Sequence, residues 1–297
     1  MIIPALLFSL NNARPEEDSS GGFVLWAFAD IQPRNRTEEK SFENAVSDIE
    51  KNNIYISAAI AGGDMVQMSS SSDPDKQWQW FYDSIRPLNI KHLYEIIGNH
   101  DARNIPAYFR YTGKPLHYSV RFGNLIIILL SDEKNSSGTD ISDKAFFWWK
   151  DVVESNQDKI IITVTHSHLG GTGFAYNFPR YRNVMNSERF TEVLRKNRVD
   201  FWLFGHTHVP YILKGKERKL PQLNNTLFIN IAAIREDYFL SSSESRFFYF
   251  QPGSENVIIK TRDHGKNKFV DSIELKVKLK YKFVYNGEEP EINSFRN

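Results

Sequence analysis

Five short polar motifs, each directly after a run of apolar residues, constrain the fold of this chain more than any other feature. In order they are Asp30-Ile31-Gln32, Gly62-Gly63-Asp64, Gly98-Asn99-His100-Asp101, His166-Ser167-His168 and Gly205-His206-Thr207-His208. The apolar runs before them cover residues 23–28, 54–60, 93–97, 160–164 and 201–204, and they have the length and composition of buried strands. Parallel strands in an α/β sheet present their carboxyl ends at one edge. We therefore predict that all five motifs converge on one site.

The segments between the motifs predict helices with one apolar face. Residues at spacings of three and four form the groups Phe42, Val46 and Ile49; Trp78, Phe81, Ile85 and Leu88; Phe146, Trp149 and Val153; and Phe190, Val193, Leu194 and Asn197. Strand patterns cover residues 117–130 and, after the last motif, 227–231, 246–250, 257–260 and 272–285. This order predicts an α/β fold, a four-layer sandwich of two mixed β-sheets flanked by helices.

The side chains in the motifs are those that bind divalent metal ions. Imidazole, carboxylate and carboxamide groups are ligands for Zn, Mn, Fe and similar ions, and the chain has no cysteine for a thiolate site. Five of the eight histidines lie inside the motifs, which scattered surface histidines would not produce. One such motif alone is more often a polar turn, so the prediction of a metal site rests on the whole set.

The order and wording of the motifs resemble the calcineurin-like metallophosphoesterases, over about residues 23–234. The resemblance implies the same four-layer fold and two divalent metal ions, Mn, Fe or Zn, with Mg also compatible. It implies that Asp30, Gln32, Asp64 and His208 hold one ion. It implies that Asp64, Asn99, His166 and His206 hold the other, so that Asp64 bridges the two.

Two motifs depart from the family pattern. Gln32 stands where most of the family has histidine, and a carboxamide oxygen is a harder and weaker donor that favours Mn, Mg or Fe over Zn. In the fourth motif both His166 and His168 lie near a strand end, and His168 stands where proline is common. Strand alternation and the family pattern favour His166 as the ligand, with His168 as the alternative.

The resemblance also implies a mechanism. Two divalent ions can hold a bridging hydroxide and neutralise charge as it attacks phosphorus in line. His100 would donate a proton to the leaving oxygen or stabilise charge on the phosphoryl oxygens, and Asp101 would orient a neighbouring group. We predict a metal-dependent phosphohydrolase that slightly prefers phosphodiester or nucleotide-like substrates. The alternatives are a phosphomonoesterase of the same fold and a non-catalytic metal-binding protein that kept it, although the filled ligand positions speak against the second.

Two arginines are candidates for binding a small phosphoester substrate. Arg34 lies two residues after Gln32, and Arg180 lies in a segment, residues 170–182, that combines glycines, aromatic residues and guanidinium groups. Such a segment suits a nucleotide-like or aryl phosphodiester, although a surface loop packed by its own aromatic residues explains it nearly as well.

Charge and composition bound the remaining expectations. The 37 basic and 36 acidic residues balance, so we expect no nucleic-acid polymer as partner, and the basic cluster 214–219 is interpreted as a solvated hairpin tip. Residues 22–297 are predicted to form one domain with a β-rich C-terminal part, because any boundary between the motifs would split the site.

Residues 1–21 are interpreted as a leader that is cleaved or disordered. The apolar run 2–8 is too short to span a membrane, and no basic residue precedes it as a secretion signal would require. The absence of cysteine is compatible with export, and a periplasmic or extracytoplasmic location is slightly favoured over a cytoplasmic one. The sequence does not indicate an oligomeric state.

Overall fold

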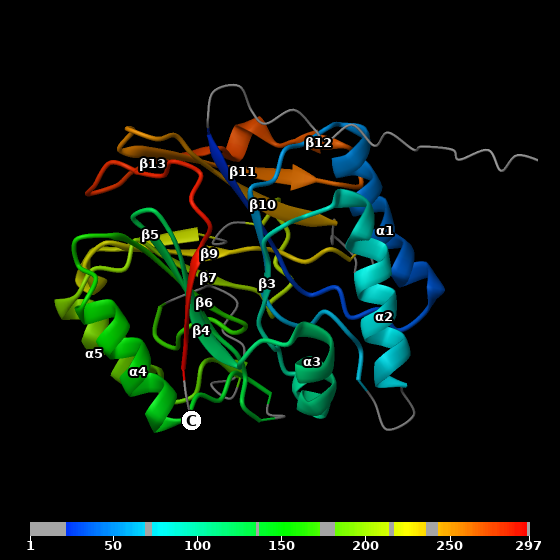
Figure 1. The fold of residues 1–297 in the computed structure, drawn as a ribbon, viewed down its shortest axis with the longest axis horizontal. Helices are drawn as coiled ribbons and strands as arrows, with labels where there is room; N and C mark the ends of the chain where they lie inside the picture. Colours follow the sequence, from blue (N-terminus) through cyan, green and yellow to red (C-terminus); the bar gives the residue numbers. More distant parts are fainter. Residues whose placement is uncertain are drawn as a thin grey trace, which may run out of the picture.

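Two β-sheets packed face to face form the centre of the molecule, with helices on both outer faces (Figure 1). The computed structural model describes residues 22–68, 73–134, 137–172, 182–213, 217–235 and 243–295. The first sheet runs in the order β12 (Lys268–Phe269), β11 (Asn256–Asp263), β10 (Glu244–Phe250), β1 (Phe23–Phe28), β2 (Ala58–Ala61) and β3 (Leu93–Glu95), with β13 (Leu275–Lys278) paired to β11. The second runs β14 (Glu291–Ser294), β4 (His117–Phe122), β5 (Leu125–Leu130), β6 (Ile160–Thr165), β7 (Phe201–Phe204), β9 (Thr226–Asn230) and β8 (Glu217–Leu220).

Three apolar layers hold the sheets and helices together and confirm the predicted four-layer sandwich. Leu25 of β1 faces Ile127 and other residues of the second sheet in the layer between the sheets. The neighbouring Trp26 points the other way, to a layer under the helices α1 (Arg36–Lys51), α2 (Pro74–Ile85) and α3 (Ile105–Thr112). A third layer, including Ile128, lies under α4 (Asp143–Glu154) and α5 (Ser187–Lys196). The central strands are continuously apolar because both of their faces are buried.

The predicted helices form where the apolar spacing indicated, and side-chain caps begin three of them. Asn35 accepts hydrogen bonds from the backbone of α1, Asp73 does so for α2 and Ser142 for α4. Leu88 lies in a 3₁₀ turn, Arg86–Leu88, and Asn197 lies just beyond the end of α5.

The parallel parts of the two sheets bring the motifs to one edge of the sandwich. β1, β2 and β3 run parallel in one sheet, and β5, β6, β7 and β9 run parallel in the other. The motifs follow β1, β2, β3, β6 and β7. A backbone hydrogen bond of 3.2 Å from Ile234, after β9, to Ala29, after β1, joins the two sheets at this edge.

Some sequence predictions of strands were wrong in extent. The strand expected at 54–60 begins only at Ala58, and the run 272–285 contains one short strand, β13, after a 3₁₀ turn. The basic cluster partly forms strand: Glu217–Leu220 is β8, an edge strand of a hairpin with β9, and residues 214–216 lie outside the described part. The missed strand β14 is exposed throughout and pairs with the edge strand β4, so it has no apolar alternation to find.

The leader predicted at residues 1–21 lies outside the described residues. Among the helices that the structure describes, none combines the length and the apolar character that crossing a membrane requires.

Candidate metal centre

Four of the predicted ligands adopt left-handed backbone conformations. The φ angles are 56° at Asp30, 56° at Asp64, 65° at His206 and 46° at His208. L-residues rarely occupy this region, and each such residue costs on the order of 1 kcal/mol or more unless its surroundings fix it. The chain turns at these positions directly after each strand, which aims the side chains back across the sheet edge.

Backbone hydrogen bonds between the motifs fix these turns. Asp30 N–H donates to the Gly63 carbonyl at 3.1 Å, and the N–H groups of Ile31 and Gln32 donate to the Asp64 carbonyl at 2.9 Å. His206 N–H donates to the Asp30 carboxylate at 2.8 Å and so links the two sheets. The first, second and fifth motifs therefore form one rigid unit.

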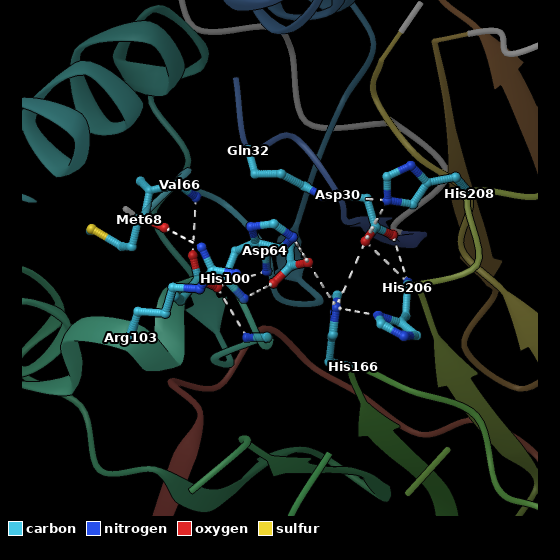
Figure 2. A network of polar contacts seen from close by, with 12 residues as sticks. Asp30, Gln32, Asp64, Val66, Met68, His100, Arg103, His166, His206 and His208 are labelled. Atoms are coloured by element: carbon cyan, nitrogen blue, oxygen red, sulfur yellow. Dashed lines mark hydrogen bonds and ion pairs between the residues drawn. The ribbon is translucent and has the colours of Figure 1, made fainter. Parts of the chain in front are cut away.

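Asp64 lies at the centre of the cluster. An Asp64 carboxylate oxygen, the His166 ring and the His206 ring offer ligand atoms that all lie within 4.8 Å of one another. His166 Nε2 is 3.1 Å from Asp64 Oδ2 and 3.3 Å from His206 Nδ1. His166 Nδ1 lies 3.0 Å from the Gly62 carbonyl, which fixes the ring and leaves Nε2 toward the cluster. Figure 2 shows these groups converging from the two sheets.

Asp30, Gln32 and His208 form a second group beside the first. His208 Nε2 lies 3.3 Å from Asp30 Oδ1 and 3.3 Å from Gln32 Nε2. Asp30 Oδ1 is also 3.8 Å from His166 Nε2, so the two groups adjoin each other at Asp30 and His166. A half-turn of the Gln32 amide exchanges its nitrogen for its oxygen, which is the atom a metal would bind.

Buried atoms without partners indicate that these groups fit metal ions. Gln32 Oε1, Asn99 Oδ1 and His206 Nε2 are buried and accept no hydrogen bond from the described residues. Such atoms are costly unless a ligand satisfies them. Oxygen and imidazole donors around two adjacent carboxylates, with no thiolate, suit Mn, Fe, Zn or Mg.

The charges of the cluster depend on one another. Burial disfavours a charged His166, but the carboxylates of Asp64 and Asp30 outweigh it and raise the pKa of His166 to about 10. Burial opposes ionisation of Asp64 as well, yet the positive charge of His166 lowers its pKa. Burial lowers the pKa of His206 to about 3, so that ring is neutral and free to act as a ligand.

Asp101 holds the second and third motifs together. Its buried carboxylate accepts hydrogen bonds from the backbone of Asp64 at 2.7 Å, Val66 and Gly98 at 3.0 Å and Met65 at 3.4 Å. Burial and the nearby Asp64 charge raise the pKa of Asp101, while these backbone donors oppose the rise. This arrangement fits the orienting role expected from the sequence, with Asp64 as the group that is oriented.

His100 lies at the rim of the cluster. Its backbone N–H donates to Asp64 Oδ1 at 2.8 Å, and its ring Nε2 is 4.0 Å from Asp64 Oδ2. Burial lowers the pKa of His100, and Asp64 opposes that effect. The His100 side chain is one-quarter exposed, whereas the His166 side chain is fully buried, so the His100 ring is partly open to solvent.

Two glycines are required because the carboxylates lie against the backbone. A Cβ on Gly98 would collide with Asp64, and a Cβ on Gly205 would collide with the Asp30 carboxylate. A further glycine, Gly63, has a φ of 95°, and a Cβ on it would lie 2.6 Å from His166 Nδ1.

The other candidates differ in placement. The His168 ring is buried, packs on Phe204 with ring centroids 5.6 Å apart, and has a pKa that burial lowers to about 4. The Arg34 guanidinium is held by Glu38, with Nε donating at 2.8 Å to Oε1. Arg180 lies outside the described residues. The phosphate-binding roles of both arginines stay predictions.

Sequence reasoning missed Arg235. This buried residue donates from Nη1 to the Gln32 carbonyl at 3.2 Å and from Nη2 to Glu38 Oε2 at 3.1 Å. It therefore braces the backbone of the first motif. The sequence did offer one signal for Arg235. This residue follows the predicted strand 227–231, whose carboxyl end reaches the sheet edge that carries the motifs.

Comparison with known proteins identifies the family. The sequence model of the calcineurin-like phosphoesterases matches residues 23–210. The chain belongs to this family. Residues that match include all five motifs, from Asp30 to His208.

Individual relatives of this calcineurin-like phosphoesterase are distant. The 3',5'-cyclic adenosine monophosphate phosphodiesterase CpdA of Haemophilus influenzae is 26% identical over 176 residues, which are 57% of this chain and 61% of CpdA. The chain therefore spans about three-fifths of that relative.

Two solved structures share the fold. One is the purple acid phosphatase PPD1 from yellow lupin (Lupinus luteus) seeds, with a TM-score of 0.60 and 14% identity over 88% of this chain and 54% of the other. The second is GAP50, the anchor in the inner membrane complex of Plasmodium, with a TM-score of 0.60 and 12% identity over 89% and 91%. Identities this low show a common fold and nothing more.

Proposed function

We propose that this protein is a metal-dependent phosphohydrolase that uses two divalent ions and slightly prefers phosphodiester or nucleotide-like small molecules. The observation that carries the proposal is the convergence of carboxylates and imidazoles at one sheet edge, where ligand atoms of Asp64, His166 and His206 lie within 4.8 Å of one another.

The ligands divide into two sets that share Asp64. Asp30, Gln32 and His208 would hold one ion with Asp64, and Asn99, His166 and His206 would hold the other. Bound ions would activate a water molecule and neutralise charge on the phosphoryl oxygens. Gln32 favours Mn, Mg or Fe over Zn at its position because its oxygen is a harder donor than imidazole.

His100 is the proposed proton donor. When the water oxygen forms its bond to phosphorus, the bond from phosphorus to the leaving oxygen breaks and leaves an alkoxide or phenoxide. A proton from His100 Nε2 would neutralise that oxygen, and solvent can restore the proton because the ring is partly exposed. Asp101 would keep Asp64 and the third motif in place, because its carboxylate accepts hydrogen bonds from the backbone N–H groups of Asp64 and Gly98.

The diester preference rests on CpdA, which is described as a cyclic adenosine monophosphate phosphodiesterase. The alternative of a phosphomonoesterase shares every ligand and differs only in the loops that select the substrate. A non-catalytic role, like the anchor role of GAP50, is opposed by the filled ligand positions.

The deciding experiment combines metal analysis with two substrates. Purified protein loaded with Mn or Zn is assayed on bis-p-nitrophenyl phosphate and p-nitrophenyl phosphate, with Asp64→Ala as the metal-free control. Two metal equivalents and faster turnover of the diester support the proposal. If two ions bind and neither ester is hydrolysed, the protein is a non-catalytic metal-binding protein. If the monoester is hydrolysed faster, the substrate preference is the reverse of the one proposed.

A substitution of His100 separates chemistry from metal binding. His100→Ala should keep both metals while kcat falls roughly a hundredfold, the usual scale for losing an acid–base group. The loss should be larger for alkyl esters than for p-nitrophenyl esters, whose leaving group needs no proton. The matched control is His92→Ala, at the opposite end of β3. It should change neither the metal content nor kcat. A missing metal, or unchanged kcat on both ester types, would remove His100 from the mechanism.

A further inference from the structure

We propose that Arg103 forms a binding site for a negatively charged group, a carboxylate or a phosphate, on the leaving part of the substrate. The proposal rests on the proposed function, because it takes the metal centre as the place where the ester bond is cleaved. Neither the family match nor the motifs assign a role to this residue.

The backbone places Arg103 on the same side as His100. His100 is the N-cap of the 3₁₀ helix η2 (Asp101–Asn104). The Arg103 N–H donates to the His100 carbonyl at 3.4 Å. Side chains three residues apart in a 3₁₀ helix lie above one another. The Arg103 side chain therefore starts from the same face of this turn as the His100 ring, and Figure 2 draws both residues on the side of the cluster away from His206 and His208.

The guanidinium is oriented at one end and keeps its charge uncompensated. Arg103 Nη1 donates to the Met68 carbonyl at 2.7 Å, and the residue is exposed to solvent. Among the residues that the structure describes, no carboxylate forms an ion pair with it. Arg34 and Arg235, also near the first motif, both pair with Glu38. Arg103 thus offers a positioned cation with free donors next to the site.

Chemistry indicates the kind of group that this cation would bind. The metal ligands surround the position of the reacting phosphoryl group, and His100 would face the leaving oxygen. A cation beyond His100 therefore meets whatever is attached to that oxygen. The guanidinium fork binds carboxylate and phosphate oxygens with paired hydrogen bonds, whereas it gains little from a neutral group.

The test uses two diesters that differ in one charge. Methyl phenyl phosphate and methyl 4-carboxyphenyl phosphate share the reacting group and have leaving phenols of similar acidity. Wild-type protein should prefer the carboxylated ester, and Arg103→Gln should lower kcat/KM for that ester about tenfold, the scale of one charge-assisted hydrogen bond. The neutral ester should be unaffected, and Arg103→Lys should keep part of the preference.

Arg110→Gln is the matched control. Arg110 is an exposed arginine on α3 that pairs with Asp75, so this substitution removes the same charge away from the site. It should leave the rates of both esters unchanged.

A binding measurement keeps this inference separate from catalysis. The products 4-hydroxybenzoate and phenol are titrated into wild-type and Arg103→Gln protein and followed by NMR. Tighter binding of 4-hydroxybenzoate only when Arg103 is present supports the proposal. Equal losses for both esters, or product binding that does not depend on Arg103, would overturn it. If wild-type protein hydrolyses neither ester, the proposed function fails, and the binding comparison still decides the role of Arg103.

Discussion

Replacing Gly98 by alanine tests whether the close approach of the third motif to Asp64 sets the geometry of the metal centre. A Cβ at this position would collide with Asp64 Oδ1 and lie 2.6 Å from Asp64 N, whereas ordinary van der Waals contact begins at 3.4 Å. Gly98 or Asp64 must therefore move by roughly 0.8 Å. Asp101, which binds the backbone of both residues, resists that movement.

The expected effect is on function more than on stability. Overpacking of a rigid site costs about 1–3 kcal/mol, which is less than the roughly 5–15 kcal/mol by which native proteins are usually stable. A ligand or catalytic group misplaced by about 1 Å loses on the order of a hundredfold in rate. Gly98→Ala should therefore remain folded, bind the metals more weakly and hydrolyse bis-p-nitrophenyl phosphate at least tenfold more slowly.

Three measurements on one preparation of the Gly98→Ala protein test this prediction. Thermal unfolding reports folding, metal analysis after dialysis reports affinity, and the diester assay reports the rate. The control is Gly113→Ala, whose φ of 63° also disfavours alanine but whose Cβ would meet no atom within 4 Å. It should lose stability and keep full activity. Wild-type metal content and rate in Gly98→Ala would refute the argument that this contact fixes Asp64.

Four further substitutions test other parts of the structure. Asp64→Ala should remove both metals without unfolding the sheets, and retention of two metal equivalents would exclude a shared ligand. His166→Ala should lose much more metal than His168→Ala, and the reverse ranking would make His168 the ligand. Asp48→Asn should lower the free energy of unfolding by about 3 kcal/mol near neutral pH, because it leaves the buried Arg262 unpaired. Arg262 and His264 overcome the effect of burial and lower the pKa of Asp48 from 3.8 to about 2, so this stabilisation is present above pH 3.8 and is lost as pH falls to about 2. Calorimetry of both proteins between these pH values should show the difference shrinking, and a constant difference would contradict the linkage.

Local sequence patterns were sufficient where one interaction dominates. Continuous apolar runs predicted the central strands because both of their faces are covered, and the spacing of residues such as Phe42 and Val46 predicted a helix with one buried face. The candidate metal ligands could be picked out because strand ends, glycines and ligand types occur together in the sequence. Weak elements were missed for the same reason: the exposed strand β14 depends on its pairing with β4.

Only the tertiary structure decided how the motifs act on one another. The left-handed turns at Asp30 and Asp64, and three of the four backbone donors to Asp101, depend on atoms that are distant in sequence and meet at the sheet edge. The bracing of the first motif by Arg235 likewise joins residues about 200 positions apart. No periodicity encodes such contacts, because they arise from the packing of two sheets. The sequence by itself thus determined the layers of the fold and indicated which residues are candidate metal ligands, while the packing of the sheets decided the distances between these residues and the placement of Arg103 on the same turn as His100.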